Sequence, residues 1–399
     1  MTEASGLQKH FSLSTGGLLY LVQRWIRGPE SPDFSIPAQI LAAIALLWLP
    51  LVLLSLFEGS FTGTKVAQPL FTDIVPHVRI LIAIPLLLLA DLIIDPSISA
   101  ATHNLESSGI ISDEEQPRFQ EVLTEIRRAR DSVWSDIVII VLAFGITWTF
   151  KPGYGDSALQ AAATSWMWSV QDGEVRYSAA GWWYLLISGP MFQVILFRWF
   201  WRFFIWAAFL FRVSRLSLVL QPTDPDLAGG LGYLGVAQQT FVVVFFAFAA
   251  VASSTIAHDI LAEGGTFDDA RPEIIVLVLV LVVTIYAPLL FFCKQLIMAR
   301  RAGLREYGSL GYRLSEAFHQ KWIREGDEGV GKELLASTDP SATADYTATY
   351  DNVRAMRPIP ATLRGVLAVA GVLLIPFLPL ALTEFSIQDL LKRLTDALV

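Results

Sequence analysis

Cysteine and charge are both scarce in this chain of 399 residues. Cys293 is the single cysteine, so no disulfide bond can form within the chain. Asp, Glu, Lys and Arg together account for 17% of the residues, whereas soluble domains have about a quarter. So little charge favours a chain that is largely buried in lipid over one with an ordinary water-exposed surface.

Catalytic and cofactor motifs are absent as well. The chain has no zinc-protease helix motif, serine-nucleophile elbow or paired-cysteine cluster. The run Gly326 to Glu333 approaches the phosphate-binding P-loop pattern, but Glu333 replaces the hydroxyl residue that binds magnesium, and no strand precedes the run. We therefore expect no enzyme activity, no cofactor and no metal site. The net charge of −8 gives no reason to expect a nucleic-acid partner.

What the chain does contain is long apolar runs, among them Ile36 to Phe57, Ile274 to Phe292 and Leu363 to Leu382. About 20 apolar residues in a helix match the hydrocarbon thickness of a bilayer, and a spanning helix satisfies its own backbone groups. The sequence therefore predicts an all-α polytopic transmembrane helical bundle. Its spanning helices, about seven in number, are expected at residues 37–57, 79–95, 135–150, 181–203, 240–258, 273–294 and 362–384.

The distribution of Lys and Arg predicts the orientation, because cytoplasmic loops are enriched in both. With the N-terminus in the cytoplasm, Arg127, Arg128, Arg130 and the basic stretch from Arg300 to Arg324 lie inside, and few basic residues lie outside. An odd number of spans then places the C-terminus outside. Residues that prefer the membrane interface gather at the predicted outer end of the fourth span: Trp166, Trp168, Tyr177, Trp182, Trp183 and Tyr184.

The first two segments of the chain are a cytoplasmic N-terminal segment and the main membrane domain. Residues 1–36 form the former, in which residues 17–27 suit either an interfacial helix or a disordered start. Residues 37–296 hold six of the predicted spans and a cytoplasmic helical extension near 112–134, where apolar residues recur at helical spacing.

Two further segments complete the chain. Residues 297–361 are a cytoplasmic connection that is helical first and then, from Gly326 to Thr349, a flexible loop rich in Gly, Ser, Thr and Asp. Residues 362–399 combine the last span with an amphipathic helix over 385–399, suited to the outer leaflet or to a partner.

The fourth predicted span carries two arginines within an aromatic stretch. If Trp183 marks the outer interface, Arg198 lies in the inner half of the hydrocarbon and Arg202 lies one turn further, near the inner boundary. An arginine at this depth is costly unless it snorkels, pairs or faces water. Two interpretations remain open. The arginines line a cationic pathway mouth or an anionic-lipid site, or they snorkel within an aromatic belt.

Three carboxylates are expected at a similar depth on the second and third predicted spans: Asp91, Asp95 and Asp136. Pairing with Arg198, Arg202 or Lys294 lowers the cost of burying both signs, which predicts a structural salt-bridge cluster. The alternative is a proton or cation relay that uses Asp91.

The connection from Gln221 to Gly235 combines prolines, aspartates and glycines. Such a loop is able to bind an anion through backbone amides or to form part of a gate. It can equally be an ordinary turn whose aspartates neutralise the arginines that precede it. The candidate residues for pathway or anion binding here are Arg212, Arg215, Asp224 and Asp226, and those for gating are Gly229, Gly230 and Gly232.

Prolines interrupt several of the predicted spans, namely Pro50, Pro85, Pro190, Pro288, Pro376 and Pro379. A proline removes an internal hydrogen bond and kinks a helix. Kinks widen cavities and provide hinges, which favours transport over passive anchoring.

These features favour a channel or transporter for an ion or small solute, with a basic cytoplasmic-side mouth, in a membrane of the bacterial inner-membrane type. An anionic-lipid-binding sensor or scaffold is the second interpretation. A membrane-embedded lipid-phosphate enzyme, the third, requires Asp224 and Asp226 around a metal beside Arg212 or Arg215. The partners considered are membrane lipids, anionic phospholipid among them, and other copies of the chain in a homo-oligomer.

Overall fold

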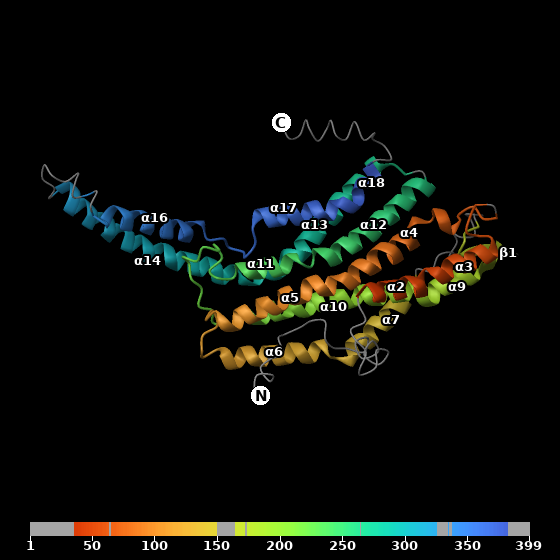
Figure 1. The fold of residues 1–399 in the computed structure, drawn as a ribbon, viewed down its shortest axis with the longest axis horizontal. Coiled ribbons are helices and arrows are strands. Elements are labelled where there is room, and N and C mark those ends of the chain that lie inside the picture. Colours follow the sequence, from red (N-terminus) through yellow and green to blue (C-terminus); the bar gives the residue numbers. More distant parts are fainter. Residues whose placement is uncertain are drawn as a thin grey trace.

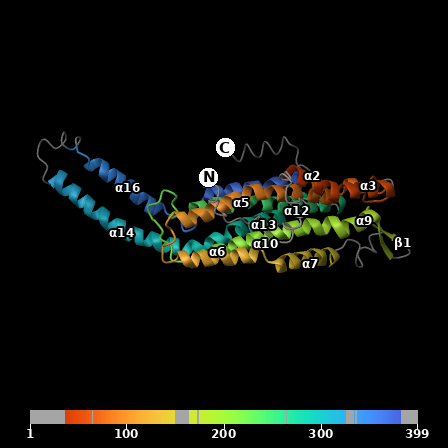
Figure 2. The same ribbon diagram turned by 60° about the horizontal axis from the view of Figure 1, so that its bottom comes forward.

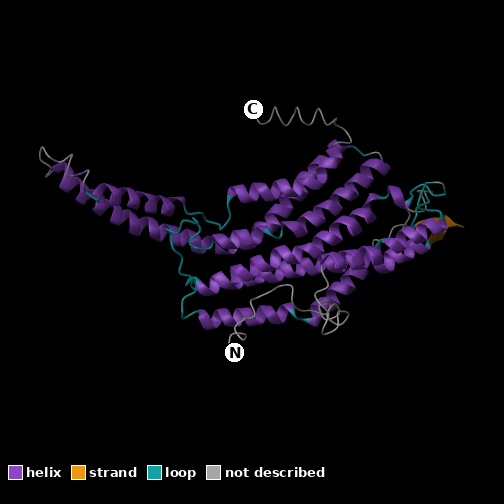
Figure 3. Cartoon of the chain, viewed as in Figure 1, coloured by secondary structure: helices purple, strands orange, loops and turns teal. Residues whose placement is uncertain are grey.

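A computed structural model describes residues 36–63, 65–149, 164–171, 174–263, 265–324, 334 and 337–381, and most of them are helical (Figure 3). The helices form one elongated bundle, and two helices extend from one of its ends (Figure 1). We call this end the arm end. At the opposite end, the sheet end, β1 (Trp168–Gln171) pairs antiparallel with β2 (Glu174–Tyr177).

In the described part of the chain, six helices are long and apolar enough to cross a membrane, and a bent helix pair makes seven if it counts as one span. The predicted transmembrane class and number of spans are therefore confirmed. The six are α2 with α3 (Ile36–Leu47, Leu49–Glu58); α4, η2 and α5 (Ile74–His77, Val78–Ala83, Ile84–Ser107); α9, η3 and α10 (Ala179–Trp183, Tyr184–Ser188, Gly189–Val213); α11 and α12 (Gly232–Gln239, Val242–Glu263); α13, η4 and α14 (Phe267–Tyr286, Ala287–Phe292, Cys293–His319); and α17, η6 and α18 (Leu363–Leu374, Ile375–Phe377, Leu378–Ala381). A 3-10 turn, η1 (Leu70–Thr72), precedes α4.

Large apolar side chains cover the outside of these helices. Leu41 is 67% exposed, Val141 64% and Leu279 60%. Water-soluble proteins rarely expose apolar surfaces this wide, whereas such surfaces fit a bilayer because lipid tails are as apolar as the side chains. The chain is therefore an integral, multi-pass membrane protein.

Non-α turns interrupt four of the spans, each beside a proline. The π-helical turns η2 and η3 are followed at once by Pro85 and Pro190, and the 3-10 turns η4 and η6 contain Pro288 and Pro376. Proline has no N–H, and its ring crowds the carbonyl four residues earlier, so the backbone leaves the α-helical pattern at these points. The breaks that the prolines predict in these spans are thus present.

The bent pair consists of α6 (Gln116–Arg130) and α7 (Val133–Thr149), whose axes differ by 42°. The helix expected near 112–134 is α6, but it is not a straight continuation of the span. It packs along α10 instead, where the rings of Phe119 and Phe209 lie 6.2 Å apart. The helices expected over 17–27 and 385–399 lie outside the described residues.

The arm consists of the end of α14, the π-helical turn η5 (Gln320–Arg324) and α16 (Asp339–Ala355), and it projects beyond the bundle (Figure 2). The loop predicted from Gly326 to Thr349 is therefore wrong from Asp339 onward. The reason is tertiary packing: a Cβ on Gly311 of α14 would lie 2.9 Å from the ring of Tyr346, so the missing side chain makes room for the tyrosine. This contact stabilises a helix that composition alone disfavours.

The packing of α11 against the segment that enters α17 gives a direct test of the fold. A Cβ on Gly235 would overlap the carbonyl oxygen of Pro360. We expect Gly235→Ala to lower the stability of the purified protein in detergent by about 1–3 kcal/mol, the usual cost of overpacking. Gly371→Ala is the control, since nothing lies within 4 Å of a Cβ there. Thermal unfolding midpoints that match in the two variants would contradict the packing.

Candidate functional site

Helices α5, α7 and α10 bring four charged side chains together inside the bundle. Nη1 of Arg202 lies 2.6 Å from Oδ1 of Asp91, and Nη1 of Arg198 lies 3.8 Å from Oδ1 of Asp136. Both arginines come from α10 and lie one turn apart, and each pairs with a different helix. We call these four residues the charge layer. Asp95 lies one turn from Asp91 on α5, closer to the arm end, and is half-buried.

The charge layer is covered mainly by protein. The side chain of Arg202 is 9% exposed, that of Arg198 14% and that of Asp136 9%, whereas Asp91 keeps 38%. Arginines that snorkel extend along an apolar surface toward water, and these instead turn to carboxylates on neighbouring helices. The geometry therefore favours the predicted salt-bridge cluster over snorkelling. Asp91 is the member of the cluster most accessible from outside the protein.

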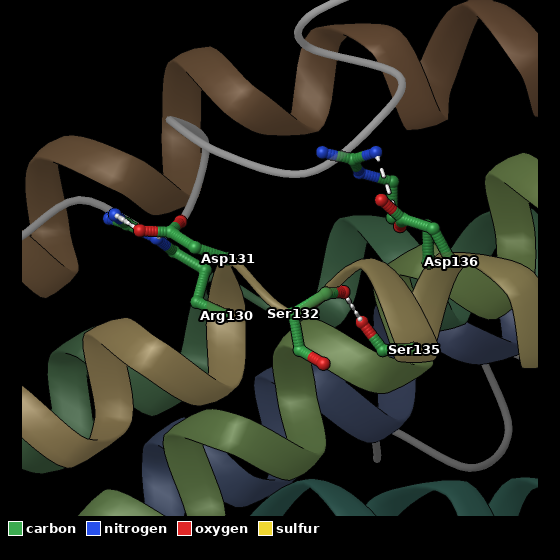
Figure 4. Close-up of polar contacts among 6 residues, drawn as sticks. Arg130, Asp131, Ser132, Ser135 and Asp136 are labelled. Atoms are coloured by element: carbon green, nitrogen blue, oxygen red, sulfur yellow. Dashed lines mark hydrogen bonds and ion pairs between the residues drawn. The ribbon is translucent and has the colours of Figure 1, made fainter.

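The bend between α6 and α7 lies close to Asp136 of the charge layer (Figure 4). Arg130 pairs with Asp131 at 2.7 Å where α6 ends, and Ser135 donates to the carbonyl of Ser132 at 2.6 Å where α7 begins. Asp136 lies in the first turn of α7, where a negative charge also complements the helix dipole. A change in the bend would move Asp136 relative to Arg198.

Aromatic and amide groups connect the charge layer to other spans. Trp199 donates to the carbonyl of Leu87 at 2.8 Å, and the guanidinium of Arg202 lies 4.6 Å from the Trp199 ring. Further along α10, Trp206 donates to Oε1 of Gln238 at 2.8 Å, and Gln238 in turn donates to the carbonyl of Ile285 at 2.5 Å. The sequence analysis missed Gln238, although a fully buried amide in a span is itself a signal of interhelical bonding.

In the loop between α10 and α11, Asp226 holds the backbone together. Its Oδ1 accepts the N–H of Ala228 at 2.7 Å and of Gly230 at 3.1 Å, and its Oδ2 accepts the N–H of Gly232 at 2.7 Å. Gly229 and Gly230 have positive φ angles of 65° and 92°, which favour glycine. The amides proposed for an external anion therefore bind a carboxylate of the loop itself.

The same loop forms the base of the arm. Arg357 donates to the carbonyl of Asp226 at 2.5 Å, and Asn352 donates to the carbonyl of Thr223 at 3.2 Å. A Cβ on Gly303 of α14 would lie 2.6 Å from Pro222, so these elements are in close contact. The loop thus joins α14, α16 and the entry to α17.

Arg212 and Arg215 have other partners than the loop aspartates. Arg212 pairs with Glu125 of α6, and the guanidinium of Arg215 lies 4.9 Å from the ring of Phe211. Burial raises the pKa of the Asp224 carboxyl above its usual value; the hydrogen bond from the Asp226 backbone N–H opposes this shift, and the negative charge of Asp226 adds to it. No group of three or more His, Cys, Asp or Glu side chains that could hold a metal occurs in the described part of the chain.

No protein-family model, no curated protein and no solved structure matches this chain. Its function therefore has to be argued from the charges and contacts of its own residues.

The pairing of Arg202 with Asp91 predicts a coupling energy. Arg202→Gln and Asp91→Asn each leave one charge without its partner, so each is expected to destabilise the protein. We expect the loss of stability in the double variant to be smaller than the sum of the two single losses, by about 1–3 kcal/mol. This coupling energy is smaller than that of a fully buried ion pair because Asp91 is partly exposed. Unfolding of all four proteins in detergent measures this term, and additive effects would contradict the pairing.

The loop gives a matched pair of variants. Asp226→Asn turns an amide N–H₂ toward backbone N–H groups, so we expect a loss of about 1–3 kcal/mol in stability. Asn at position 224 can still accept the N–H of residue 226, now donated at 2.9 Å, and it removes a charge beside Asp226. Asp224→Asn is therefore expected to keep or raise stability at pH 7. An equal loss in both variants would argue against the role of Asp226.

The raised pKa of Asp224 also sets the sign of a pH dependence. The folded protein holds the proton of the Asp224 carboxyl more tightly than the unfolded chain does. The resulting contribution to the free energy of unfolding is fully present below about pH 4 and is lost as pH rises through the folded-state pKa. In Asp224→Asn this part of the pH dependence should disappear. Unfolding midpoints measured from pH 4 to pH 7 in both proteins provide the check.

Proposed function

We propose that the protein moves an ion or a small solute across a membrane, as a channel or transporter. The charge layer that α5, α7 and α10 form between apolar helices carries the proposal. Ionisable side chains inside spanning helices are costly, and they are typical of proteins that conduct ions, protons or solutes. A passive anchor needs no such layer.

Interrupted helices support the same proposal. The turns η2, η3, η4 and η6 break the α-helical pattern of four spans. Such breaks free backbone groups and are frequent at functional sites of membrane and soluble proteins. In a transporter they supply both binding groups and hinges.

In this proposal, α7 is the moving element. The bend at Asp131 and Ser132 acts as its hinge, and the ion pair of Arg198 with Asp136, at 3.8 Å, is longer than that of Arg202 with Asp91, at 2.6 Å. The longer pair costs less to separate because Coulomb attraction falls with distance. Arg202 and Asp91 then keep α5 and α10 together while α7 moves.

We further propose that the arm end lies in the cytoplasm and the sheet end outside. The basis is the set of basic residues on α6 and α14 near the arm end, including Arg127, Arg128, Arg300 and Arg301. The charge layer then belongs to the basic cytoplasmic-side mouth of the proposed pathway. A bacterial inner membrane, contact with anionic phospholipid and assembly into a homo-oligomer belong to the same proposal.

A second candidate is a membrane scaffold or sensor that binds anionic lipid. The arm favours it, because two helices that project beyond the bundle offer a surface to partners (Figure 2). The basic side chains of α6 and α14 suit the headgroups of anionic phospholipid. In that case the bundle is an anchor and the arm is the functional part.

We propose no catalytic role. A lipid-phosphate enzyme would need Asp224 and Asp226 around a metal beside Arg212 or Arg215. The carboxylate of Asp226 accepts three amides of its own loop, and Arg212 pairs with Glu125. This interpretation therefore has the least support.

Flux measurements on the reconstituted protein test the transport proposal. We expect proteoliposomes to conduct at least one of H⁺, Na⁺, K⁺, Cl⁻ or phosphate. Arg198→Gln should change flux or selectivity by about tenfold, which corresponds to about 1.4 kcal/mol in a barrier, without abolishing insertion. Arg313→Gln, at an exposed site on the arm, is the control.

Two results would count against the proposal. Unchanged flux in Arg198→Gln would remove Arg198 from the mechanism. An absence of flux for every solute in the wild-type protein, together with binding to vesicles that contain phosphatidylglycerol, would favour the scaffold.

A further inference from the structure

The two π-helical turns of the bundle's second and fourth predicted spans meet near the sheet end. Arg79 lies in η2 and Tyr184 begins η3, and Nη1 of Arg79 donates to the Tyr184 hydroxyl at 2.7 Å. The guanidinium of Arg79 also lies 5.8 Å from the ring of Phe192 on α10. A cation and a hydroxyl are thus held together where both helices depart from α-helical geometry, as functional sites often do.

Among the described residues, Arg79 has no carboxylate partner, in contrast to the arginines of the charge layer. Among the ion pairs of the described residues, Arg198 and Arg202 each have a carboxylate, and Arg79 has none. Its Nε is covered from solvent and has no hydrogen-bond partner in the described part of the chain. A half-buried cation in a spanning segment is costly without an anion nearby, so this arrangement suits an anionic ligand.

Ionisable side chains at the sheet end have partners of their own. Asp73 accepts the N–H of Val75 at 3.2 Å and the indole N–H of Trp166 at 2.9 Å. Glu58 accepts the N–H of Ala179 at 2.8 Å. His77 uses Nδ1 to accept from Trp48 at 3.1 Å. None of these contacts involves Arg79.

We propose that Arg79 and Tyr184 bind an oxyanion, that is, a phosphate or carboxylate group. Guanidinium N–H groups match such oxygens in charge and geometry. The Tyr184 oxygen accepts from Arg79, so its own hydrogen can be donated elsewhere, and no acceptor for it occurs among the hydrogen bonds of the described residues. One ligand oxygen can accept from this hydroxyl while another pairs with the guanidinium.

The site is separate from the charge layer. Arg79 and Asp91 are 12 positions apart in the same span, which is about 18 Å along a helix. An oxyanion bound at Arg79 would lie at the sheet end, at an entrance or an exit of a pathway. The binding site itself does not depend on the proposed function. Only the further idea that the bound oxyanion is the transported solute rests on the proposed function.

Ligand-dependent stabilisation of the purified full-length protein tests the site. Thermal unfolding is followed by tryptophan fluorescence while sodium phosphate or sodium acetate replaces sodium chloride at constant ionic strength. We expect a saturable rise of the midpoint with at least one of the two oxyanions. Arg79→Gln should weaken this binding at least about tenfold, and Tyr184→Phe should weaken it several-fold.

Two controls separate binding from a structural role. Arg176→Gln removes an exposed arginine of β2 at the same end and should leave the response unchanged. Without ligand, Arg79→Gln should unfold close to the wild type, because the loss of the hydrogen bond to Tyr184 is offset by removal of a half-buried charge that has no carboxylate partner among the described residues. Arg79→Lys keeps the charge but loses the planar fork, so its affinity should be intermediate.

The experiment also distinguishes a soluble oxyanion from a lipid headgroup. If phosphate stabilises the protein in nanodiscs of zwitterionic phosphatidylcholine but not in those of phosphatidylglycerol, the anionic headgroup of phosphatidylglycerol occupies the site. A response in both identifies a soluble ligand. No response of the wild type to phosphate, acetate or phosphatidylglycerol, or an equal response in Arg79→Gln, would overturn the proposal. Binding that depends on Arg79 without any flux would retain the site and reject only transport.

Discussion

The ion pair of Arg202 with Asp91 shows the constraint on which the whole bundle depends, namely that a charge within hydrocarbon must find its partner inside the protein. The pair joins α10 to α5, and Arg198 with Asp136 joins α10 to α7. Helix α10 therefore holds its neighbours through charge as well as through apolar packing. Trp206 and Gln238 extend the same principle to α11 and α13, where an indole and an amide are matched with each other and with a backbone carbonyl.

At the arm end, the same requirement is met by a loop instead of a helix pair. Asp226 accepts three amides of its own loop, and the carbonyl of the same residue accepts from Arg357. The loop rich in Pro, Asp and Gly is thus an ordered connection between the membrane helices and the arm. Arg79 at the sheet end is the contrasting case, since its charge has no counterpart among the described residues.

Several features were accessible from the sequence because they depend on short-range physics. Span length follows from the number of apolar residues in a run, and the helix breaks follow from prolines such as Pro85 and Pro190. The association of Asp91 and Asp136 with the two arginines follows from the cost of burying charge. The helix α16 was missed because its stability comes from tyrosines that pack on glycines of α14, a contact between residues far apart in the chain.

By itself, then, the sequence determined that the chain spans a membrane with about seven helices and where most of them break, because hydropathy and proline act over one helix at a time. Tertiary structure alone decided which arginine has a carboxylate partner among the described residues and which does not. Arg79, Arg198 and Arg202 look alike in the sequence, each an arginine in an apolar run. Their difference arises from which helix lies beside them, and that depends on the packing of the whole bundle.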